Sequence, residues 1–444
     1  MRKILLLALL VLLCGVTWQQ ARAQTEAIFV LEITGPVTPA MASYFERGIA
    51  EAEKVGATAV LIILNTPGGN LDPTQEIVQH LRTARVPVIV YIAPRGAQAA
   101  SAGSIITLAA HASGMSPETV IGAASPVGDG GADLGETIAR KLIEDLKALV
   151  RGLAARRGEE AVTLAEEMIE NARAVTAEEA LAIGLIDAVA EDVPDLLRQL
   201  DGLVVLVNGQ EVTLATAAAP QQPFAMNLLE QILQMLANPL LVGVLFAIGV
   251  QAILIELSNP GGWVAGFIGV LALALGLYGA GQLPVNWLGL GLIVVAFALF
   301  VAEVLATNHG ALGVTGAITL LAGLLVLFNS PGSPEFARIS LPGAIGISAI
   351  TASFFIFVGM KALAAQKRQP STGTEGLVGQ AGVVRRELTV KVEGSPYRGM
   401  VLVNGELWQA QAEAPIAQAE RVVVTAVNGF VLTVIPAAAT SAHN

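Results

Sequence analysis

The stretch ATAVLIILNTPGGNLDPTQEIVQHLRTARVPVIVYIA, residues 57–93, decides the fold of the N-terminal half. Residues 57–65 and 86–93 are apolar runs rich in β-branched side chains, and residues 71–84 place apolar side chains at helical spacing. The order strand, helix, strand predicts a largely parallel sheet covered by helices. Because the residues on either side continue this alternation, we expect residues 24–203 to form one α/β domain.

Composition and charge limit the class of protein. Of the 444 residues, 54% are hydrophobic and 14% are charged, and the net charge is −11. Because binding to phosphate groups requires basic patches, this charge argues against a nucleic acid as a partner. The average composition of the whole chain is too apolar for a purely soluble protein. The length of the chain suggests several domains.

The first residues predict export. Two basic residues precede the apolar run 4–16, and the small residues at 21 and 23 fit a signal peptidase site. We therefore expect residues 1–23 to be a signal peptide. The single cysteine, Cys14, lies inside this segment, so the mature protein has no disulfide and no thiol chemistry.

Residues 226–363 are almost free of charge and predict a helical membrane domain. A segment rich in alanine, glutamine and proline, residues 204–225, predicts a linker before it. The membrane domain contains about five segments near the roughly 20 residues that a bilayer requires. These segments are 238–257, 262–283, 285–306, 311–329 and 342–360.

The number of spans predicts the orientation. A cleaved signal peptide leaves the α/β domain extracytoplasmic, and five spans return the chain to the cytoplasm. Lys361, Lys367 and Arg368 directly follow the last span, in agreement with the positive-inside tendency. We therefore expect a multi-pass protein of the cell (inner) membrane with a cytoplasmic C-terminal domain.

Two parts of the membrane domain repeat each other. Glu256 and Glu303 lie 47 residues apart near the ends of the first and third spans. Three pairs of glycines have the same separation: Gly266 and Gly313, Gly269 and Gly316, and Gly276 and Gly323. This interval indicates a duplicated helical hairpin with small residues at helix contacts. Acidic groups in membranes are often functional, but we favour an interfacial position for both glutamates.

The C-terminal residues 375–436 alternate apolar and polar side chains, with Asn-Gly turns at 404–405 and 428–429. About five short strands in so few residues predict a small closed β-barrel of the OB type. OB folds often bind nucleic acids, but no basic stripe interleaved with aromatic residues is present. A structural role or a contact with another protein is therefore the better interpretation.

A serine stands among small residues in APRGAQAASAG, residues 93–103. Small neighbours of Ser101 allow another backbone to approach, as a cleft around a nucleophile requires. The Gly-Gly turn in NTPGGNLDP, residues 65–73, leaves backbone amides unshielded. Acyl transfer needs N–H donors at the oxyanion, each contributing roughly 3–4 kcal/mol, and the amides of Gly69 and Ala102 are the candidates. From the residues alone, a helix cap is the first interpretation of Ser101.

A serine nucleophile also needs a base. The four histidines are His80, His111, His309 and His443. Their positions on a surface helix, in a turn, in a membrane loop and in the tail favour non-catalytic roles. A lysine can replace histidine when its amine is neutral, which burial promotes. Lys141 and Lys147 lie six residues apart on different faces of one predicted helix, and their spacing leaves the choice open.

Four motifs together resemble a known family. They are NTPGGNLD, APRGAQAASAG, IGAASPVG and TAEEALAIGLIDAVA. They are similar to the ClpP-class membrane serine proteases and, more closely, to the long-form NfeD family, the stomatin-operon partner proteins. The similarity covers nearly the whole chain. It implies a ClpP/crotonase-like fold for the α/β domain and an OB fold at the C-terminus.

The resemblance also implies roles for individual residues. Ser101 matches the nucleophile of the family, Lys141 rather than Lys147 matches the base, and Gly69 and Ala102 match the oxyanion positions. The chain departs from the family pattern at 158–160 and at 111–120, and neither departure touches these residues. Where the soluble ClpP proteases place their histidine, this chain has Ala123-Ala124-Ser125, which supports a Ser/Lys dyad.

The function implied by the resemblance is a membrane-anchored serine endopeptidase without cofactor or metal. Its substrates would be apolar segments of membrane-associated partners such as stomatin-like proteins, and it would form a homodimer or a higher oligomer. A second hypothesis is a non-catalytic membrane scaffold that organises stomatin- or flotillin-like proteins through its OB domain. Crotonase-type CoA reactions rank third, because they would need no membrane domain.

Overall fold

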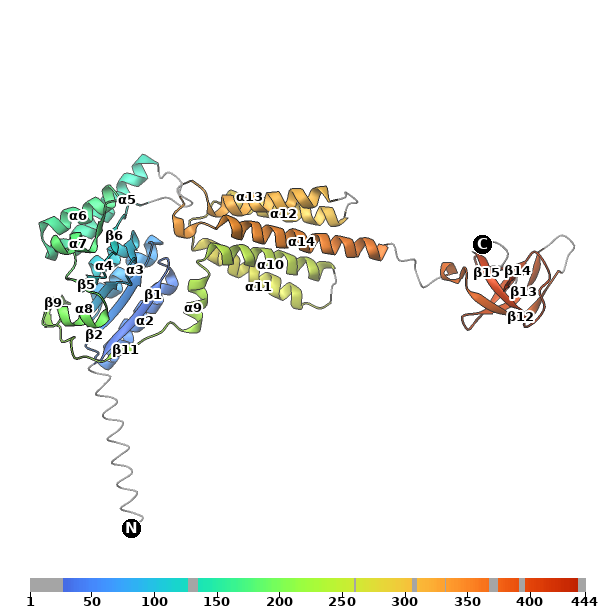
Figure 1. The fold of residues 1–444 in the computed structure, drawn as a ribbon, viewed down its shortest axis with the longest axis horizontal. Helices are drawn as coiled ribbons and strands as arrows, with labels where there is room; N and C mark the ends of the chain where they lie inside the picture. Colours follow the sequence, from blue (N-terminus) through green and yellow to red (C-terminus); the bar gives the residue numbers. More distant parts are fainter. Residues whose placement is uncertain are drawn as a thin grey trace, which may run out of the picture. The chain divides into compact units, whose positions relative to one another are not determined.

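The computed structural model describes residues 27–126, 135–258, 261–305, 310–331, 333–366, 374–390 and 396–437. Contacts divide the chain into two compact units, Met1–Phe355 and Ile356–Asn444. The first unit contains the α/β domain and the membrane helices up to the middle of the last one, and the second contains the end of that helix and the barrel (Figure 1). The predicted signal peptide, residues 1–23, lies outside the described residues, as do Lys367, Arg368, His309 and His443.

The α/β domain is built on a six-stranded sheet in which every pair of neighbours is parallel. Its strand order is β11-β1-β2-β3-β5-β8. The strands are β1 (Ile28–Thr34), β2 (Ala59–Asn65), β3 (Val88–Ile92), β5 (Ala112–Met115), β8 (Ala188–Val189) and β11 (Gln221–Pro223). The apolar runs 57–65 and 86–93 thus form the adjacent strands β2 and β3, as their composition predicts.

Helices cover this sheet because alternate side chains of each strand point to opposite faces. Phe29 and Leu31 of β1 face one apolar core, whereas Ile28 belongs to the core on the other face. The helices of the domain are α2 (Pro39–Val55), α3 (Leu71–Thr83), α4 (Ala102–Ala109), α5 (Glu136–Ala154), α6 (Glu159–Glu170), α7 (Ala177–Ala182) and α8 (Val193–Gln199).

A second, three-stranded sheet supports the turn that contains Ser101. It consists of β4 (Gln98–Ala100), β6 (Val120–Gly122) and β7 (Ala174–Thr176). Strand β4 pairs in parallel with β6, and β6 pairs antiparallel with β7. Strand β4 ends at Ala100 and helix α4 begins at Ala102, so Ser101 is the single residue between them.

Residues 204–225 differ from the predicted linker. They form the hairpin β9 (Val204–Val207) and β10 (Gln210–Thr213), followed by β11, which pairs with β1. The side chains of Val205 and Val207 are buried in the same core as α8. Strand β11 is held by backbone hydrogen bonds to β1. Such bonds form whatever the side chains are, so the polar composition that predicted a linker does not prevent a strand here.

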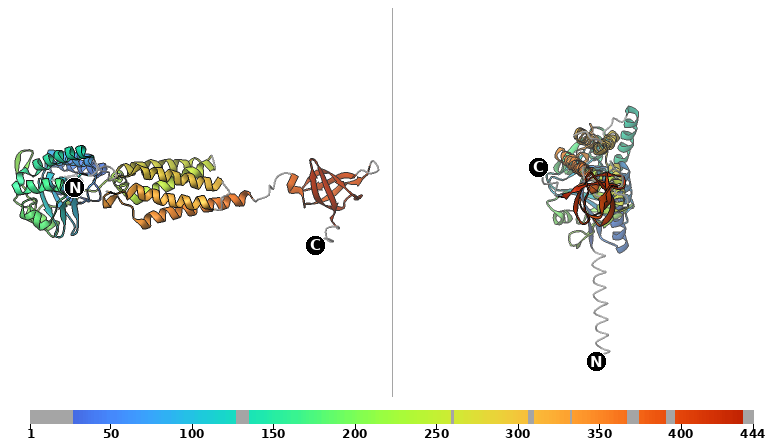
Figure 2. Two further views of the ribbon diagram at one scale, coloured as in Figure 1. Left: turned by 90° about the horizontal axis from the view of Figure 1, so that it is seen from above. Right: turned by 90° about the vertical axis from the view of Figure 1, so that its right-hand side faces the viewer.

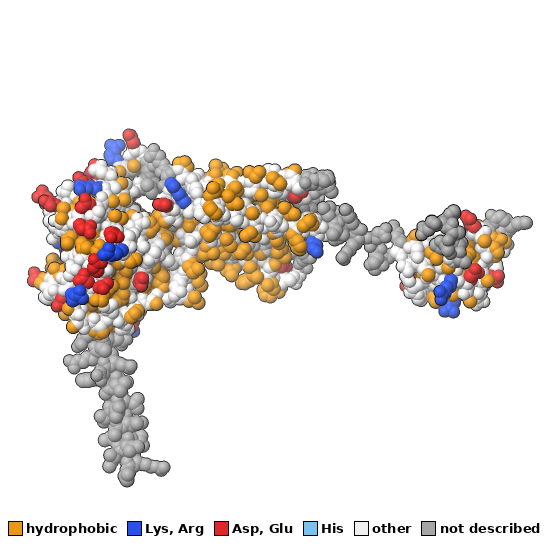
Figure 3. All heavy atoms as spheres, in the orientation of Figure 1, with side chains coloured by type: hydrophobic (Ala, Val, Ile, Leu, Met, Phe, Trp, Pro, Cys, Tyr) orange, Lys and Arg blue, Asp and Glu red, His pale blue; other side chains and the backbone are white. Residues whose placement is uncertain are grey.

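Apolar helices follow the α/β domain, after the short helix α9 (Leu228–Met235). They are α10 (Pro239–Ser258), α11 (Val264–Gly281), α12 (Trp287–Leu305), α13 (Ala311–Phe328) and α14 (Leu341–Gln366). By length and composition, four of them can cross a membrane, and α12 has a shorter apolar segment, 287–303. The helices lie side by side (Figure 2), and hydrophobic side chains cover their visible face while charged ones gather on the α/β domain (Figure 3).

The two hairpins α10–α11 and α12–α13 have equivalent contacts, in agreement with the predicted duplication. The Glu256 carboxylate accepts hydrogen bonds from the N–H groups of Trp263 and Gly266, at 2.7 and 3.3 Å. The Glu303 carboxylate accepts from Gly310, Leu312 and Gly313, at 2.8 to 3.1 Å. Each glutamate thus satisfies the free amides at the start of the next helix, which is a structural role.

The C-terminal domain is a closed five-stranded barrel in the order β12-β13-β14-β16-β15. Its strands are β12 (Ala381–Thr389), β13 (Tyr397–Val403), β14 (Glu406–Ala412), β15 (Arg421–Asn428) and β16 (Val431–Pro436). Asn404 and Gly405 have φ angles of 50° and 86° in the hairpin turn between β13 and β14. This positive-φ pair is what the Asn-Gly sequence predicts.

Candidate active site

Ser101 occupies a strained turn between β4 and α4. Its φ and ψ angles are 51° and −115°, a combination that costs free energy for a residue with a Cβ atom. Two interactions hold this backbone: the Ser101 N–H donates to the Gly122 carbonyl at 2.8 Å, and the Ser104 hydroxyl donates to the Ser101 carbonyl at 2.7 Å. Serine nucleophiles on sharp strand-to-helix turns have this arrangement, which exposes the hydroxyl.

Gly68 is required beside this turn. It has a φ of 111°, and a Cβ atom there would lie 2.7 Å from the Cβ of Ser101. Only a glycine therefore allows the 66–70 segment to lie against the serine. Gly68 was missed as a site residue at the level of sequence, where both glycines of the pair look alike.

The Gly69 amide points to the side of the chain that holds Ser101. The Val37 N–H donates to the Gly68 carbonyl at 2.8 Å, and the Asn70 N–H donates to the Val37 carbonyl at 3.1 Å. Val37 thus bonds to the residues before and after Gly69, as in a parallel pair of strands. In such a pair the N–H of the middle residue, here Gly69, points away from Val37. Strand β4 flanks the opposite side of the segment, through hydrogen bonds of Thr66 with Gln98 and Ala100.

The amides of Gly69 and Ala102 are available to a ligand. Neither N–H donates to an acceptor in the described part of the chain, and Ala102 is the first residue of α4, where helical amides lack partners. Free amides at a helix N-terminus also favour negative charge. The two donors predicted from the sequence therefore lie on either side of the Ser101 turn.

A cavity of about 670 Å³ adjoins Ser101. Gly69 and Ala102 line it, and so do Leu142 and Leu146 of α5. The other residues around it are mostly small or apolar, and they include Pro39, Pro67, Ile105, Ala123, Ala124 and Pro126. An extended polypeptide with apolar side chains fits such a lining better than a charged small molecule does.

The two candidate bases lie on α5 in different surroundings. Lys147 forms an ion pair with Glu170 at 2.7 Å, and this hydrogen bond raises the pKa of the Lys147 amine. Lys141 is exposed, and it directly precedes Leu142, which lines the cavity. No hydrogen bond joins the Lys141 amine to the Ser101 hydroxyl within the residues the structure describes.

His111 has a structural role. Its side chain is 3% exposed, and its Nδ1 atom accepts a hydrogen bond from the Val88 N–H at 3.0 Å. Burial, with smaller contributions from Arg156 and Arg82, lowers the pKa of His111 to about 4. His111 does not line the Ser101 cavity. The interpretation as a non-catalytic residue agrees with this environment.

The neutral His111 predicts a pH-dependent stability. The unfolded chain binds a proton at His111 near pH 6.5, whereas the folded chain resists it down to about pH 4. This stability is therefore complete above pH 6.5 and is lost progressively as the pH falls from 6.5 to about 4, by roughly 3 kcal/mol in total. We expect hydrogen exchange in β3 and β5 of the full chain to accelerate over this interval. His111→Asn should flatten the change, and an unaltered pH dependence would contradict the assignment.

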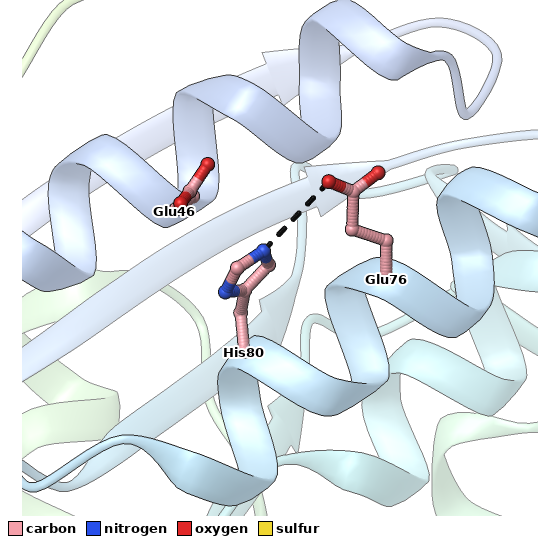
Figure 4. A group of neighbouring side chains, drawn as sticks. All are labelled: Glu46, Glu76 and His80. Carbon is pink, nitrogen blue, oxygen red and sulfur yellow. Dashed lines mark ion pairs between the residues drawn. The ribbon is translucent and has the colours of Figure 1, made fainter.

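A group of possible metal ligands lies elsewhere on the domain. Ligand atoms of Glu46, Glu76 and His80 lie within 4.8 Å of one another on α2 and α3 (Figure 4). His80 and Glu76 approach to 3.9 Å, as expected for residues four apart on a helix. Both glutamates are exposed, and none of the three residues lines the Ser101 cavity. The arrangement is that of a solvated surface ion pair.

Family comparisons cover the three parts of the chain. Residues 27–203 match the N-terminal domain of NfeD1b, and residues 240–380 match the NfeD integral membrane domain. Residues 374–436 match the NfeD-like C-terminal, partner-binding domain. These matches follow the division into an α/β domain, apolar helices and a barrel.

Individual relatives are similar over most of their length. Membrane-bound protease PH1510 from Pyrococcus horikoshii is 34% identical over 423 residues, covering 92% of this chain and 93% of that protein. Membrane protein NfeD1b from Bacillus subtilis is 26% identical over 344 residues, covering 74% and 72%.

A solved structure of the N-terminal part is also similar. It is a lysine-to-alanine mutant of a membrane-bound stomatin-specific protease in complex with a substrate peptide. It is 34% identical and covers 47% of this chain and 96% of its own, with a TM-score of 0.44. On its identity to PH1510 along nearly the whole length, and on the three domain matches, the chain belongs to the NfeD family and is a membrane-bound serine protease.

Proposed function

We propose that the chain is an endopeptidase in which Ser101 attacks the substrate and Lys141 acts as the general base. The observation that carries the proposal is the strained Ser101 turn with the free amides of Gly69 and Ala102 beside it. Ser101 Oγ forms an ester with the substrate carbonyl carbon while its proton passes to the neutral Lys141 amine. That proton then goes to the leaving amine, and water hydrolyses the ester.

The base must approach the nucleophile for this reaction. Lys141 is exposed in the single chain, so the proposal requires α5 to move toward the cavity, or a second copy of the chain to cover the amine. Catalytic hydrogen bonds are often long before substrate binds and shorten in the complex. The ion pair of Lys147 with Glu170 supports Lys141 as the base, because it holds the Lys147 amine in its charged form. We propose a homodimer or higher oligomer.

We also propose the substrate class and the orientation. Apolar segments of membrane-associated proteins, such as stomatin-like proteins, suit the apolar side chains in the lining of the cavity and the specificity of the related protease. The α/β domain lies outside the cell membrane, and the barrel lies in the cytoplasm, where it binds the partner protein. This orientation depends on the predicted signal peptide and on counting the shorter apolar segment of α12 as a fifth span.

One labelling experiment tests both the chemistry and the orientation. A membrane-impermeant fluorophosphonate added to intact cells should modify the wild-type chain and should not modify Ser101→Ala. Modification only after the cells are opened would reverse the orientation while leaving the chemistry intact. No modification in either condition, with the partner protein still co-purifying, would favour the non-catalytic scaffold.

A further inference from the structure

Helix α9 attaches the membrane helices to the α/β domain. In its first turn, Glu230 accepts two hydrogen bonds from Arg47 of α2, at 2.8 and 2.6 Å, and is only 6% exposed. Near its end, the Gln234 side chain donates to the Pro36 carbonyl at 3.0 Å. A two-point ion pair to a buried carboxylate is directional, so α9 has a defined position on α2.

The end of α9 contacts the end of α11. The Leu236 carbonyl lies against Gly279, where an added Cβ atom would be 2.5 Å from the carbonyl oxygen. Leu236 itself is 3% exposed. Helix α11 ends two residues later, at Gly281, so this close contact places the segment that follows α11 next to the α/β domain.

Two segments of the membrane domain line the Ser101 cavity. The first is 281–284, between α11 and α12, and the second contributes Pro334 and Phe336, between α13 and α14. Leu283 is 5% exposed, and Phe336 is partly buried against the helical core. We call these two segments the membrane wall of the cavity.

The membrane wall contains a polar group without a partner. The side-chain oxygen of Gln282 is buried and accepts no hydrogen bond within the described residues. An unpaired buried acceptor is unfavourable, and a donor that reaches it from the cavity would restore a hydrogen bond. The backbone N–H of an extended peptide is a donor of this kind, and it would be accompanied by apolar side chains that suit Leu283 and Phe336.

We propose that the membrane wall is part of the substrate-binding groove. Leu283 and Phe336 contact apolar side chains of the substrate, and Gln282 accepts a hydrogen bond from its backbone. The occupant is an extended apolar polypeptide segment, because the cavity is continuous with Ser101 and with the free amides beside it. The proposal rests on the proposed function and deepens it: the membrane domain selects the segment that is cleaved and also anchors the protease.

Peptide kinetics with the full chain in lipid nanodiscs test this wall. The substrates are two internally quenched ten-residue peptides, one with a leucine- and valine-rich centre and one with alanines in its place. Phe336→Ala and Leu283→Ala should each lower kcat/KM for the leucine peptide about tenfold, mainly through KM, with a smaller effect on the alanine peptide. Phe267→Ala is the matched control, because Phe267 is 61% exposed in the first turn of α11, about 20 Å along the helix from Gly281.

Fluorophosphonate labelling separates the two proposals. Labelling of Ser101 at the wild-type rate in Phe336→Ala, with lower kcat/KM, supports the membrane wall. Labelling and kcat/KM that are both unchanged, with the same preference for leucine, would overturn it. Failure of the wild-type chain to be labelled at all would instead refute the proposed function.

Cross-linking tests the wall without an activity measurement. A benzophenone derivative of the leucine peptide is bound to the Ser101→Ala chain and activated by light, and the adducts are mapped by mass spectrometry. We expect adducts at residues 281–284 or at Phe336, together with adducts in the α/β domain. Adducts confined to the α/β domain or to the lipid-facing parts of the helices would overturn the proposal.

Discussion

Replacing Ser101 with alanine is expected to lower kcat/KM for peptide cleavage by about 10⁴-fold or more. The substitution removes the nucleophile, and the free amides alone cannot form the acyl-enzyme. The free energy of unfolding should change little, because the Ser101 hydroxyl has no hydrogen-bond partner in the described chain and alanine meets the same positive φ. Cleavage by the purified full chain, together with thermal unfolding, measures both quantities.

The control for this substitution is Ser104→Ala, three residues further along the chain. Ser104 is 1% exposed, and its hydroxyl donates to the Ser101 carbonyl. Ser104→Ala should cost about 1 kcal/mol of stability and retain most of the activity. Wild-type cleavage by Ser101→Ala, or a complete loss of cleavage only in Ser104→Ala, would refute Ser101 as the nucleophile.

Replacing Lys141 with alanine is expected to lower kcat about 10²- to 10⁴-fold while KM stays within a few-fold. A base accelerates the transfer of the serine proton but makes little contact with the bound substrate. Steady-state cleavage of a peptide by the purified full chain gives both kcat and KM.

Lys147→Ala is the matched control on the same helix. It removes the ion pair with Glu170, which is partly solvated, so the loss of stability should be small. Its kcat and KM should resemble those of the wild type. Equal losses of kcat in both variants would mean that the charge or folding of α5, rather than one amine, determines the activity.

Much of the fold could be predicted from the sequence because the strongest patterns are local. The apolar runs at 57–65 and 86–93 became β2 and β3, and the Asn-Gly pair at 404–405 became a hairpin turn. Strand β11 could not be predicted, since its three residues are held by backbone hydrogen bonds to β1, distant in the sequence. The amino-acid composition of a short segment does not predict such a pairing.

The candidate site was predictable only in part. Ser101 and the Gly-Gly turn stand out by composition, but the direction of the Gly69 amide depends on hydrogen bonds with Val37. The spacing of Lys141 and Lys147 on α5 could not show which of them is the better candidate for the base. The structure shows a difference between them, because Lys147 forms an ion pair with Glu170. The membrane wall comes from residues at least 180 positions after Ser101, and no local pattern links the two.

The most direct test of the account is peptide mapping by mass spectrometry of the full chain after reaction with a fluorophosphonate. We predict a single modified residue, Ser101, with a labelling rate that falls at least a hundredfold in Lys141→Ala but not in Lys147→Ala. Modification of another serine, or equally fast labelling of Ser101 without Lys141, would contradict the account.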